Sequence, residues 1–379
     1  MPRLKIEIDS SEEKEIIEFL KRREDSEAKR LIRFFSFPDL SRNPESPIFE
    51  LVQRVLKIPR FADFDDVKVP EVVPTRILFD LFNMPPGHPA RSKSDTYYVD
   101  ENHVLITHDT VMWHYYFEHP AIKEKIAEGK DLGVVCYAKV YRKDEIDRTH
   151  MNVFHQLGAL YLTRDEKRKI VLEDLKKILG DVAKSIFGSN VEYNFTPEVF
   201  PYTDPSIEMN IKIKGEWLEM VGSGLPRKDV LKNFGVEGYN GWAFGFGLER
   251  LAMVSMDLPD IRLLWSNDER VKKQLKLGNK FQEVSKYPPI TRDISFVVSK
   301  DFIPNNYFDL IRDIGGNLVE EVQLIDKYED EEKFGSEKIS YTYRIIYRSN
   351  ERTLESSEID PLQNEIYLET EKQFHAQVR

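Results

Sequence analysis

The sequence predicts an α+β fold: an antiparallel sheet flanked by helices, followed by a small separate module. Residues 208–214 alternate apolar and polar side chains, and Gly215 then turns the chain into a second such stretch at 217–221. Strict alternation is typical of a half-buried strand, so these stretches predict an antiparallel hairpin. After residue 284 the pattern runs strand, helix, strand, strand, helix, which is the order of a ferredoxin-like module.

The N-terminal sixty residues are expected to form a helical extension. Residues 10–33 are dense in charge and carry apolar side chains at helical spacing, which predicts one surface helix. Three prolines then separate it from a second short helix at 48–56. The irregular mixture of helices and strands that follows favours an α+β domain over a doubly wound parallel one. The expected domains are 1–60, 61–283 and 284–379.

Within the C-terminal module, strands are expected at 294–298, 322–328 and 339–347, and helices at 307–318 and 362–374. The module holds twelve Lys and Arg against nineteen Asp and Glu. Because the phosphate backbone of a nucleic acid attracts clustered basic residues, a nucleic-acid partner would need local basic patches here.

Composition narrows the class of protein. The chain has 379 residues, a formal net charge of −11 and one cysteine, Cys136, which excludes disulfides within the chain and cysteine-based zinc sites. No stretch reaches the ~18 apolar residues of a membrane span, so no membrane partner is expected. The N-terminus has neither a secretory apolar core nor a transit-peptide composition. The cytoplasm is the expected compartment, and a processed form in the mitochondrial matrix fits the same observations.

A glycine-rich segment, Gly-Trp-Ala-Phe-Gly-Phe-Gly-Leu-Glu-Arg-Leu at 241–251, ends in Arg250. Glycines let a backbone approach a ligand or a neighbouring strand closely. Apolar residues follow at helical spacing, so a helix is expected to begin here with Arg250 in its first turn. The string is not a dinucleotide-binding fingerprint, because an arginine replaces the last glycine. Taken alone it also fits a structural strand-to-helix turn.

Arg142 stands at the end of an apolar stretch and before a charged segment. A strand carrying Arg142 into a loop would return as a second strand with Phe154 and Gln156 on one face, because side chains two apart share a face. Guanidinium stays charged and grips phosphate and carboxylate oxygens with its planar fork. Taken alone, the segment also fits a charged hairpin with a core phenylalanine.

Together the two segments resemble motifs 2 and 3 of the class II aminoacyl-tRNA synthetases, and the chain from about residue 70 onward resembles a phenylalanyl-tRNA synthetase of the single-chain, mitochondrial type. The first sixty residues show no clear match. The strings that carry the resemblance are His88–Arg91, Asp95–Tyr98, Tyr141–Asp147, Phe154–Leu157, Phe200–Ser206, Glu216–Glu219, Gly241–Asp257, Asp260–Arg262, Lys286–Pro288, Asp293–Phe296 and Glu351–Leu354.

The resemblance implies an ATP-dependent ligase that activates phenylalanine, transfers it to tRNA(Phe) and uses Mg²⁺. Arg142 and Arg250 would be the catalytic residues, and Phe154 would stack on adenine under Arg250. The implied ATP-binding residues are Arg142, Thr149, His150, Met151, Phe154, Glu219 and Arg250. The implied amino-acid-binding residues are His108, Thr110, Gln156, Phe200, Tyr202, Ala243 and Phe244. Glu219 and Asp204 are the implied Mg²⁺ ligands, and Arg344, Arg348 and Arg352 are candidate tRNA contacts.

The chain departs from the family near the expected site of the substrate amino group. The family has Gln-x-Glu where this chain has Gln156-Leu-Gly158, so an expected carboxylate is missing. Asp109 replaces a small hydroxyl residue in the preceding His-Thr-Ser pattern. We hypothesise that Asp109 supplies the missing negative charge, because an unpaired cation in a dry pocket would be costly. The alternative is a solvated Asp109 without a ligand role.

Tyr202 stands where single-chain relatives often carry a second phenylalanine. An apolar pocket rejects an added hydroxyl group by only about 10²-fold. No segment is left over for a proofreading domain, so measurable charging of tyrosine is expected.

Two alternatives to the phenylalanine enzyme stay open: a synthetase-like paralogue that binds tRNA or an amino acid without charging, and a synthetase for another aromatic amino acid. The resemblance implies that the chain works as a monomer and that its C-terminal module reads the anticodon. Surface or packing roles are expected for the histidines at 88, 103, 114, 119, 155 and 375.

Overall fold

The computed structural model describes residues 3–143, 148–349 and 351–379. It divides into two compact units, Met1–Phe281 and Gln282–Arg379. The N-terminal sixty residues, expected as a separate extension, lie in the first unit. In the described part of the chain, no helix combines the length and the apolar character that a membrane crossing requires.

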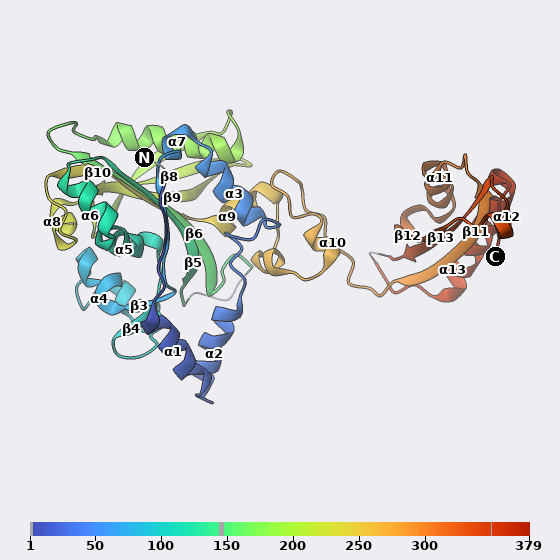
Figure 1. The fold of residues 1–379 in the computed structure, drawn as a ribbon, viewed down its shortest axis with the longest axis horizontal. Helices are drawn as coiled ribbons and strands as arrows, with labels where there is room; N and C mark the ends of the chain where they lie inside the picture. The colour runs from blue at the N-terminus through green and yellow to red at the C-terminus, as the bar shows by residue number, and fades with distance from the viewer. Residues whose placement is uncertain (1–2, 144–147, 350) are drawn as a thin grey trace. The chain divides into compact units, whose positions relative to one another are not determined.

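An eight-stranded sheet organises the first unit (Figure 1). Its central and later strands are antiparallel, and only the pairs β1–β2 and β2–β5 are parallel. The antiparallel sheet predicted from the sequence is therefore confirmed. In spatial order the strands are β1 (Lys5–Glu7), β2 (Asp65–Lys68), β5 (Leu132–Tyr141), β6 (Val153–Arg164), β10 (Tyr239–Gly247), β9 (Glu216–Pro226), β8 (Thr203–Ile213) and β7 (Tyr193–Phe200).

The predicted hairpin is strands β8 and β9, which pair antiparallel from Ile213↔Glu216 onward. Lys214 and Gly215 form the turn with φ of 53° and 91°. Positive φ at both central residues matches the twist of the flanking strands, and glycine at the second position adopts it without steric cost.

Helices cover both faces of the sheet. Alternate β6 residues such as Leu160 and Leu162 share one core with helices α4 (Thr75–Leu78), α5 (Met112–Glu118), α6 (Pro120–Ala127) and α8 (Lys228–Asn233). Three further helices are α3 (Pro47–Leu56), α7 (Leu172–Phe187) and α9 (Leu248–Met256), of which α3 contacts both α7 and α9. Smaller elements are the pair β3 (Val72–Pro74) and β4 (His103–Leu105), and α10 (Glu269–Lys272).

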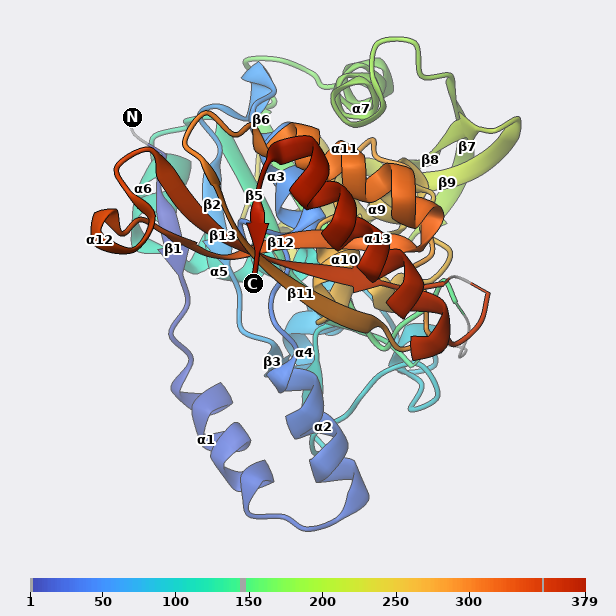
Figure 2. The same cartoon turned by 90° about the vertical axis from the view of Figure 1, so that its right-hand side faces the viewer.

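The N-terminal helices differ from the prediction of one helix at 10–33. Two helices, α1 (Ser11–Lys21) and α2 (Ser26–Ser36), form a hairpin that projects from the unit (Figure 2). The break occurs because Asp25 caps α2, its side chain accepting a hydrogen bond of 3.0 Å from the Ala28 backbone N–H. The second predicted helix is confirmed as α3, which Ser46 caps in the same way.

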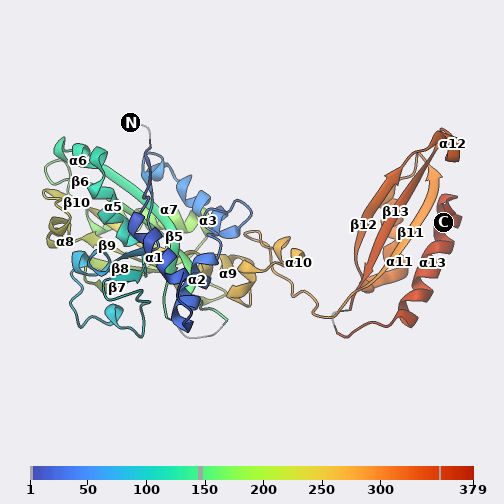
Figure 3. The ribbon, with the colours of Figure 1, turned by 60° about the horizontal axis from the view of Figure 1, so that its bottom comes forward.

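The second unit has the predicted order of elements, with its sheet in the order β12-β13-β11-β14. Helices α11 and α13 pack against each other and against the sheet (Figure 3). The buried rings of Phe296, Tyr307 and Tyr343 join the two layers. The elements are β11 (Ile290–Ser299), α11 (Pro304–Gly315), β12 (Val319–Tyr328), α12 (Glu331–Phe334), β13 (Lys338–Tyr347), α13 (Ser356–Phe374) and β14 (Gln377–Val378). The short elements α12 and β14 were not predicted.

Gly241 provides a test of how closely β10 and β6 approach. A Cβ atom at this position would lie 1.7 Å from the Tyr161 backbone oxygen, which cannot move without shifting the sheet. We predict that Gly241→Ala lowers the free energy of unfolding of the first unit by about 3 kcal/mol or more. Urea unfolding followed by tryptophan fluorescence measures this change.

The matched control is Gly247→Ala on the same strand, because no atom lies within 4 Å of a Cβ added there. Equal effects of the two substitutions would contradict the close approach of the strands.

Candidate active site

A cavity of about 380 Å³ opens in the first unit, lined by residues from β6, β8, β9, β10, α9 and the loops beside them. Arg142 and Arg250, 108 positions apart in the sequence, both line it. Every residue that the resemblance implied for ATP or the amino acid is also part of this lining. They are His108, Thr110, Arg142, Thr149, His150, Met151, Phe154, Gln156, Phe200, Tyr202, Glu219, Ala243, Phe244 and Arg250.

Three glycines on neighbouring strands, Gly158, Gly245 and Gly222, form a part of the sheet without side chains, which we call the glycine floor. Gly158 on β6 pairs with Gly245 on β10, and Gly245 pairs with Gly222 on β9. Side chains from other elements fill the space that these glycines leave. A Cβ atom at Gly222 would lie 2.9 Å from the ring of Phe200, and one at Gly158 would lie 1.8 Å from Asp109 Oδ2.

Arg142 follows directly after β5 and lines the cavity. Its Nε donates a hydrogen bond of 3.0 Å to the Thr107 carbonyl oxygen. The guanidinium carbon lies 5.3 Å from the centre of the Phe154 ring, within cation–π range. A candidate phosphate ligand and a candidate base-stacking ring are therefore neighbours.

The predicted alternation along β6 is confirmed. Phe154 and Gln156 line the cavity, whereas His155 points to the other face and is fully buried. The Gln156 Oε1 atom accepts a hydrogen bond of 3.1 Å from the backbone N–H of Asp109, which ties the 3-10 turn Asp109–Val111 to the strand. The packing role expected for His155 is also what its burial indicates.

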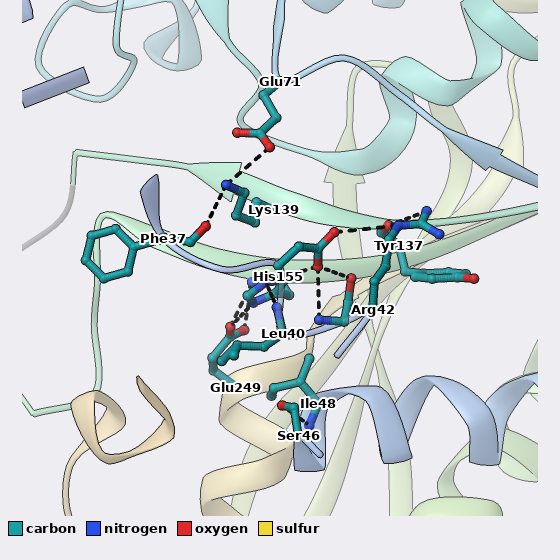
Figure 4. A network of polar contacts seen from close by, with 12 residues as sticks. Phe37, Leu40, Arg42, Ser46, Ile48, Glu71, Tyr137, Lys139, His155 and Glu249 are labelled. Atoms are coloured by element: carbon teal, nitrogen blue, oxygen red, sulfur yellow. Dashed lines mark hydrogen bonds and ion pairs between the residues drawn. The ribbon is translucent and has the colours of Figure 1, made fainter. Parts of the chain in front are cut away.

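His155 sits at the centre of a buried polar network (Figure 4). Its Nδ1 lies 2.6 Å from Glu249 Oε1, and its backbone N–H donates to both Glu249 oxygens at 2.9 and 2.8 Å. On the far side of the ring, Nε2 lies 2.9 Å from the Leu40 backbone nitrogen and 3.4 Å from Asp39 Oδ1. The network thus joins β6, the first turn of α9 and the N-terminal segment.

Charge on the His155 ring depends on two opposing effects. Burial lowers the pKa of His155, but the charge of Glu249 and hydrogen bonds to Asp39 and Glu249 outweigh it and raise the pKa to about 9. The Leu40 N–H can donate to Nε2 only when the ring is neutral, whereas the Asp39 carboxylate attracts the protonated ring. Either charge state of His155 therefore finds a partner at Nε2.

An aromatic pocket forms one end of the cavity. The rings of Phe200 and Tyr202 stack with centres 5.8 Å apart, and Phe82 and Trp113 pack edge-on against Tyr202. Trp113 lines the cavity and Phe82 supports Tyr202 from behind the lining, and neither was predicted. Both are fully buried side chains that sequence alone does not distinguish from core residues.

His108 lies beside this pocket. Burial and the nearby Arg142 lower the pKa of His108 to about 3, so its ring is neutral. Its Nδ1 contacts the Thr110 hydroxyl, while Nε2 is buried without a hydrogen-bond partner among the described residues. The ring is therefore positioned at the edge of the pocket as a neutral polar group.

Acidic residues gather near Arg250. Glu219 Oε2 lies 3.5 Å from Arg250 Nη1. Burial and the like charges of Glu219 and Glu198 raise the pKa of Glu208, a residue that the sequence did not single out. Asp204, an implied metal ligand, is exposed and lies outside the cavity lining, so that role stays a prediction. The described residues hold no cluster of three metal-binding side chains.

The three arginines proposed for tRNA differ in exposure. Arg344 pairs with Asp293 at 2.8 Å and Arg352 pairs with Glu358, and both are largely exposed. The Arg348 side chain is only 13% exposed, pairs with Glu320 at 2.9 Å and also donates to the Tyr287 carbonyl oxygen. These contacts give Arg348 a structural role at the start of the second unit.

Comparison with known proteins shows the family of this chain. A family model described as "tRNA synthetases class II core domain (F)" matches residues 36–275, and one described as "Ferredoxin-fold anticodon binding domain" matches residues 285–379. The chloroplastic/mitochondrial phenylalanine–tRNA ligase of Arabidopsis thaliana is 40% identical over 84% of this chain and 73% of its own length. This chain belongs to the phenylalanine–tRNA ligase family.

Other members of the family align over similar lengths. The mitochondrial phenylalanine–tRNA ligase of Mus musculus is 37% identical over 80% of this chain and 72% of its own length. The mitochondrial enzyme of Saccharomyces cerevisiae is 33% identical over 84% of this chain and 83% of its own length.

A solved pyrrolysyl-tRNA synthetase from Desulfitobacterium hafniense aligns at 18% identity and a TM-score of 0.47, over 68% of this chain and 83% of that one.

Glu249 provides a test of the buried network. Glu249→Ala would leave the buried N–H groups of His155 without their acceptor, so we predict that it lowers the free energy of unfolding by about 3 to 5 kcal/mol. Urea unfolding measures the loss. The control is Glu216→Ala, an exposed glutamate on β9, for which a change within about 0.5 kcal/mol is expected. A small effect at Glu249 would mean that the pair contributes little to the fold.

Proposed function

We propose that this chain is a phenylalanine–tRNA ligase that activates phenylalanine with ATP and transfers it to tRNA(Phe). The observation that carries the proposal is the convergence of Arg142 and Arg250 on one cavity whose lining includes the aromatic pocket of Phe200 and Tyr202. That combination suits a substrate with an aromatic side chain and a reaction in which charge develops on phosphates.

The activation step needs position and positive charge more than proton transfer. The nucleophile is the amino-acid carboxylate, which is already ionised, so no general base is required. Arg142 holds the α-phosphate and the substrate carboxylate, and Arg250 covers the adenine ring that stacks on Phe154. Both guanidinium groups offset the charge that grows on the phosphates. Thr149, His150 and Met151 lie along the nucleotide.

Mg²⁺ suits the acidic residues near Arg250. Burial and the charge of Glu219 raise the pKa of Glu208, and a divalent cation beside the two carboxylates relieves their repulsion. Mg²⁺ binds through one or two carboxylates plus phosphate oxygens and keeps much of its water, so a complete protein cage is not required. When bound, the ion neutralises charge on the phosphate oxygens.

Phenylalanine is the substrate that the pocket supports best, with Phe200, Tyr202, Ala243 and Phe244 as its walls. Tyrosine is the nearest competitor. Because a largely apolar pocket discriminates against an added hydroxyl by only about 10²-fold, tyrosine is expected to be activated at a measurable rate.

The second unit is proposed to contact the anticodon, and the chain to act as a monomer. Exposed ion pairs such as Arg344–Asp293 contribute little stability. Their guanidinium groups can therefore exchange a carboxylate for a phosphate at small cost. The cytoplasm stays our expectation for this chain, while the curated relatives compared above are named as chloroplastic or mitochondrial enzymes.

Amino-acid-dependent ATP–pyrophosphate exchange tests the activity. With each of the twenty amino acids in turn, we expect phenylalanine to give the highest kcat/KM and tyrosine about 10² lower. If none of the twenty amino acids supports exchange, the chain is better explained as a binding paralogue that does not charge tRNA. A higher kcat/KM for another aromatic amino acid would identify that amino acid as the substrate. A preference for phenylalanine over tyrosine above ~10⁴ would contradict the expected weak discrimination of about 10².

Paired arginine variants make the exchange assay specific to the cavity. Arg142→Lys should reduce kcat/KM by about 10²-fold or more, because an ammonium group cannot hold two oxygens in one plane. Arg227→Lys is the control, since that arginine is exposed, pairs with Asp229 and lies outside the cavity lining.

Arg344 and Arg352 test the role of the second unit. We predict that Arg344→Gln and Arg352→Gln each raise the KM for tRNA(Phe) several-fold and reduce its salt dependence, because each removes a charge that contacts phosphate. Pyrophosphate exchange should be unchanged, since it does not involve tRNA. Arg168→Gln, an exposed arginine of the first unit, is the control. Unchanged aminoacylation by both variants would place tRNA binding elsewhere.

A further inference from the structure

Asp109 is a buried carboxylate inside the cavity. Its residue is 2% exposed and belongs to the 3-10 turn Asp109–Val111, so the alternative of a solvated side chain is wrong. The Oδ2 atom is buried and has no hydrogen-bond partner among the described residues. A buried polar atom without a partner is costly, and a ligand that pairs with this oxygen in the cavity would account for it.

The backbone around Asp109 makes room for the carboxylate. A Cβ atom at Gly158 would lie 1.8 Å from Oδ2, and one at Gly245 would lie 2.9 Å from Oδ1. No side chain other than hydrogen fits at position 158 while Asp109 is in place. The carboxylate therefore occupies the volume that a side chain from β6 would fill, and it rests on the glycine floor.

Other acidic residues in the lining already have partners. Glu249 accepts hydrogen bonds from His155, and Glu219 lies 3.5 Å from Arg250. Within the described cavity lining, Asp109 is the carboxylate that has a buried oxygen without a partner. It also lies close to the aromatic pocket: burial raises the pKa of Tyr202, and the charge of Asp109 adds to that rise.

We propose that Asp109 is the binding partner of the substrate's α-ammonium group, with the negative charge delivered from the 3-10 turn instead of from position 158 on β6. This inference rests on the proposed function and adds to it a residue that selects α-amino acids. In this arrangement the ammonium group lies against the Asp109 carboxylate while the aromatic side chain enters the pocket of Phe200 and Tyr202.

The electrostatic surroundings of Asp109 are consistent with a site that binds a cation. Burial raises the pKa of Asp109 to about 7, against its own backbone N–H and the charge of Arg142, which lower it. The other titratable groups facing it are Cys136 on β5, Tyr202 and the neutral ring of His108. A protonated Asp109 cannot pair with an ammonium group, so substrate binding is expected to weaken as the pH falls below about 7.

Calorimetric binding to wild type and Asp109→Asn tests the proposal. The probes are phenylalanine, phenethylamine, which lacks the carboxylate, and 3-phenylpropionate, which lacks the ammonium group. Asp109→Asn should weaken phenylalanine and phenethylamine by about 30-fold or more and leave 3-phenylpropionate within about 3-fold. The KM for ATP in pyrophosphate exchange should stay within the same margin, and the loss of phenylalanine affinity below pH 7 should disappear.

The results distinguish failure of the Asp109 proposal from failure of the proposed function. If wild type binds phenylalanine and Asp109→Asn binds it equally well, Asp109 is not the partner and the proposed function stands. If all three probes weaken together, the substitution has acted on the shape of the cavity and the proposal fails. If wild type neither binds phenylalanine nor supports exchange, the proposed function and this inference fail together.

A second pair of variants tests whether a carboxylate at position 158 can replace the one at position 109. Gly158→Glu alone should bind phenylalanine worse than wild type, because its Cβ collides with Asp109. Asp109→Ser combined with Gly158→Glu should recover at least about 5-fold of the affinity lost in Asp109→Ser, because one carboxylate again faces the floor. Circular dichroism and thermal unfolding show whether each variant is folded. A folded double variant without recovery would contradict the shared volume.

Discussion

The buried pair between His155 and Glu249 fixes the geometry on which the cavity depends. His155 is on β6 and Glu249 is in the first turn of α9, so their three hydrogen bonds hold a strand against the start of a helix. Because side chains alternate along a strand, anchoring His155 on one face directs Phe154 and Gln156 to the other. The same contact places Arg250, the next residue after Glu249, at the cavity. Removing water from these groups is costly, and the complete set of partners offsets that cost.

A second constraint is the row of glycines across β6, β10 and β9. A sheet surface without side chains gives a ligand room to lie against the backbone. Chemistry is then supplied from elements outside the sheet: the Asp109 carboxylate at one end and the Phe200 ring at the other. Since the side chains reach the floor from loops and turns, the charge at each point can come from different positions in the chain. This explains how the chain can lack a side chain at 158 and keep a carboxylate beside it.

Local sequence patterns predicted the elements that local interactions determine. Strict alternation gave the β8–β9 hairpin and the opposite directions of Phe154 and His155, and glycine followed by helical spacing gave the start of α9. What the sequence could not predict depends on distant partners. The segment at Asp39 and Leu40 lies 115 residues from His155, and no periodicity connects them. The burial of Asp109 likewise follows from glycines on two strands that pair only in the folded chain. Resemblance to a family supplied the site residues that pattern alone left open.

The acidic second unit illustrates why net charge is a weak guide to binding. Arg344 projects from the long strand β13 and meets its partner Asp293 on the neighbouring strand β11. Both groups are exposed, so water and salt screen their attraction and the pair contributes little to stability. A phosphate that approaches Arg344 replaces one anion with another, while the strand keeps the guanidinium in position. The repulsion from surplus carboxylates elsewhere on the unit fades beyond roughly 8 Å, the screening length at physiological salt. Local placement of a few arginines therefore matters more than the sign of the total charge.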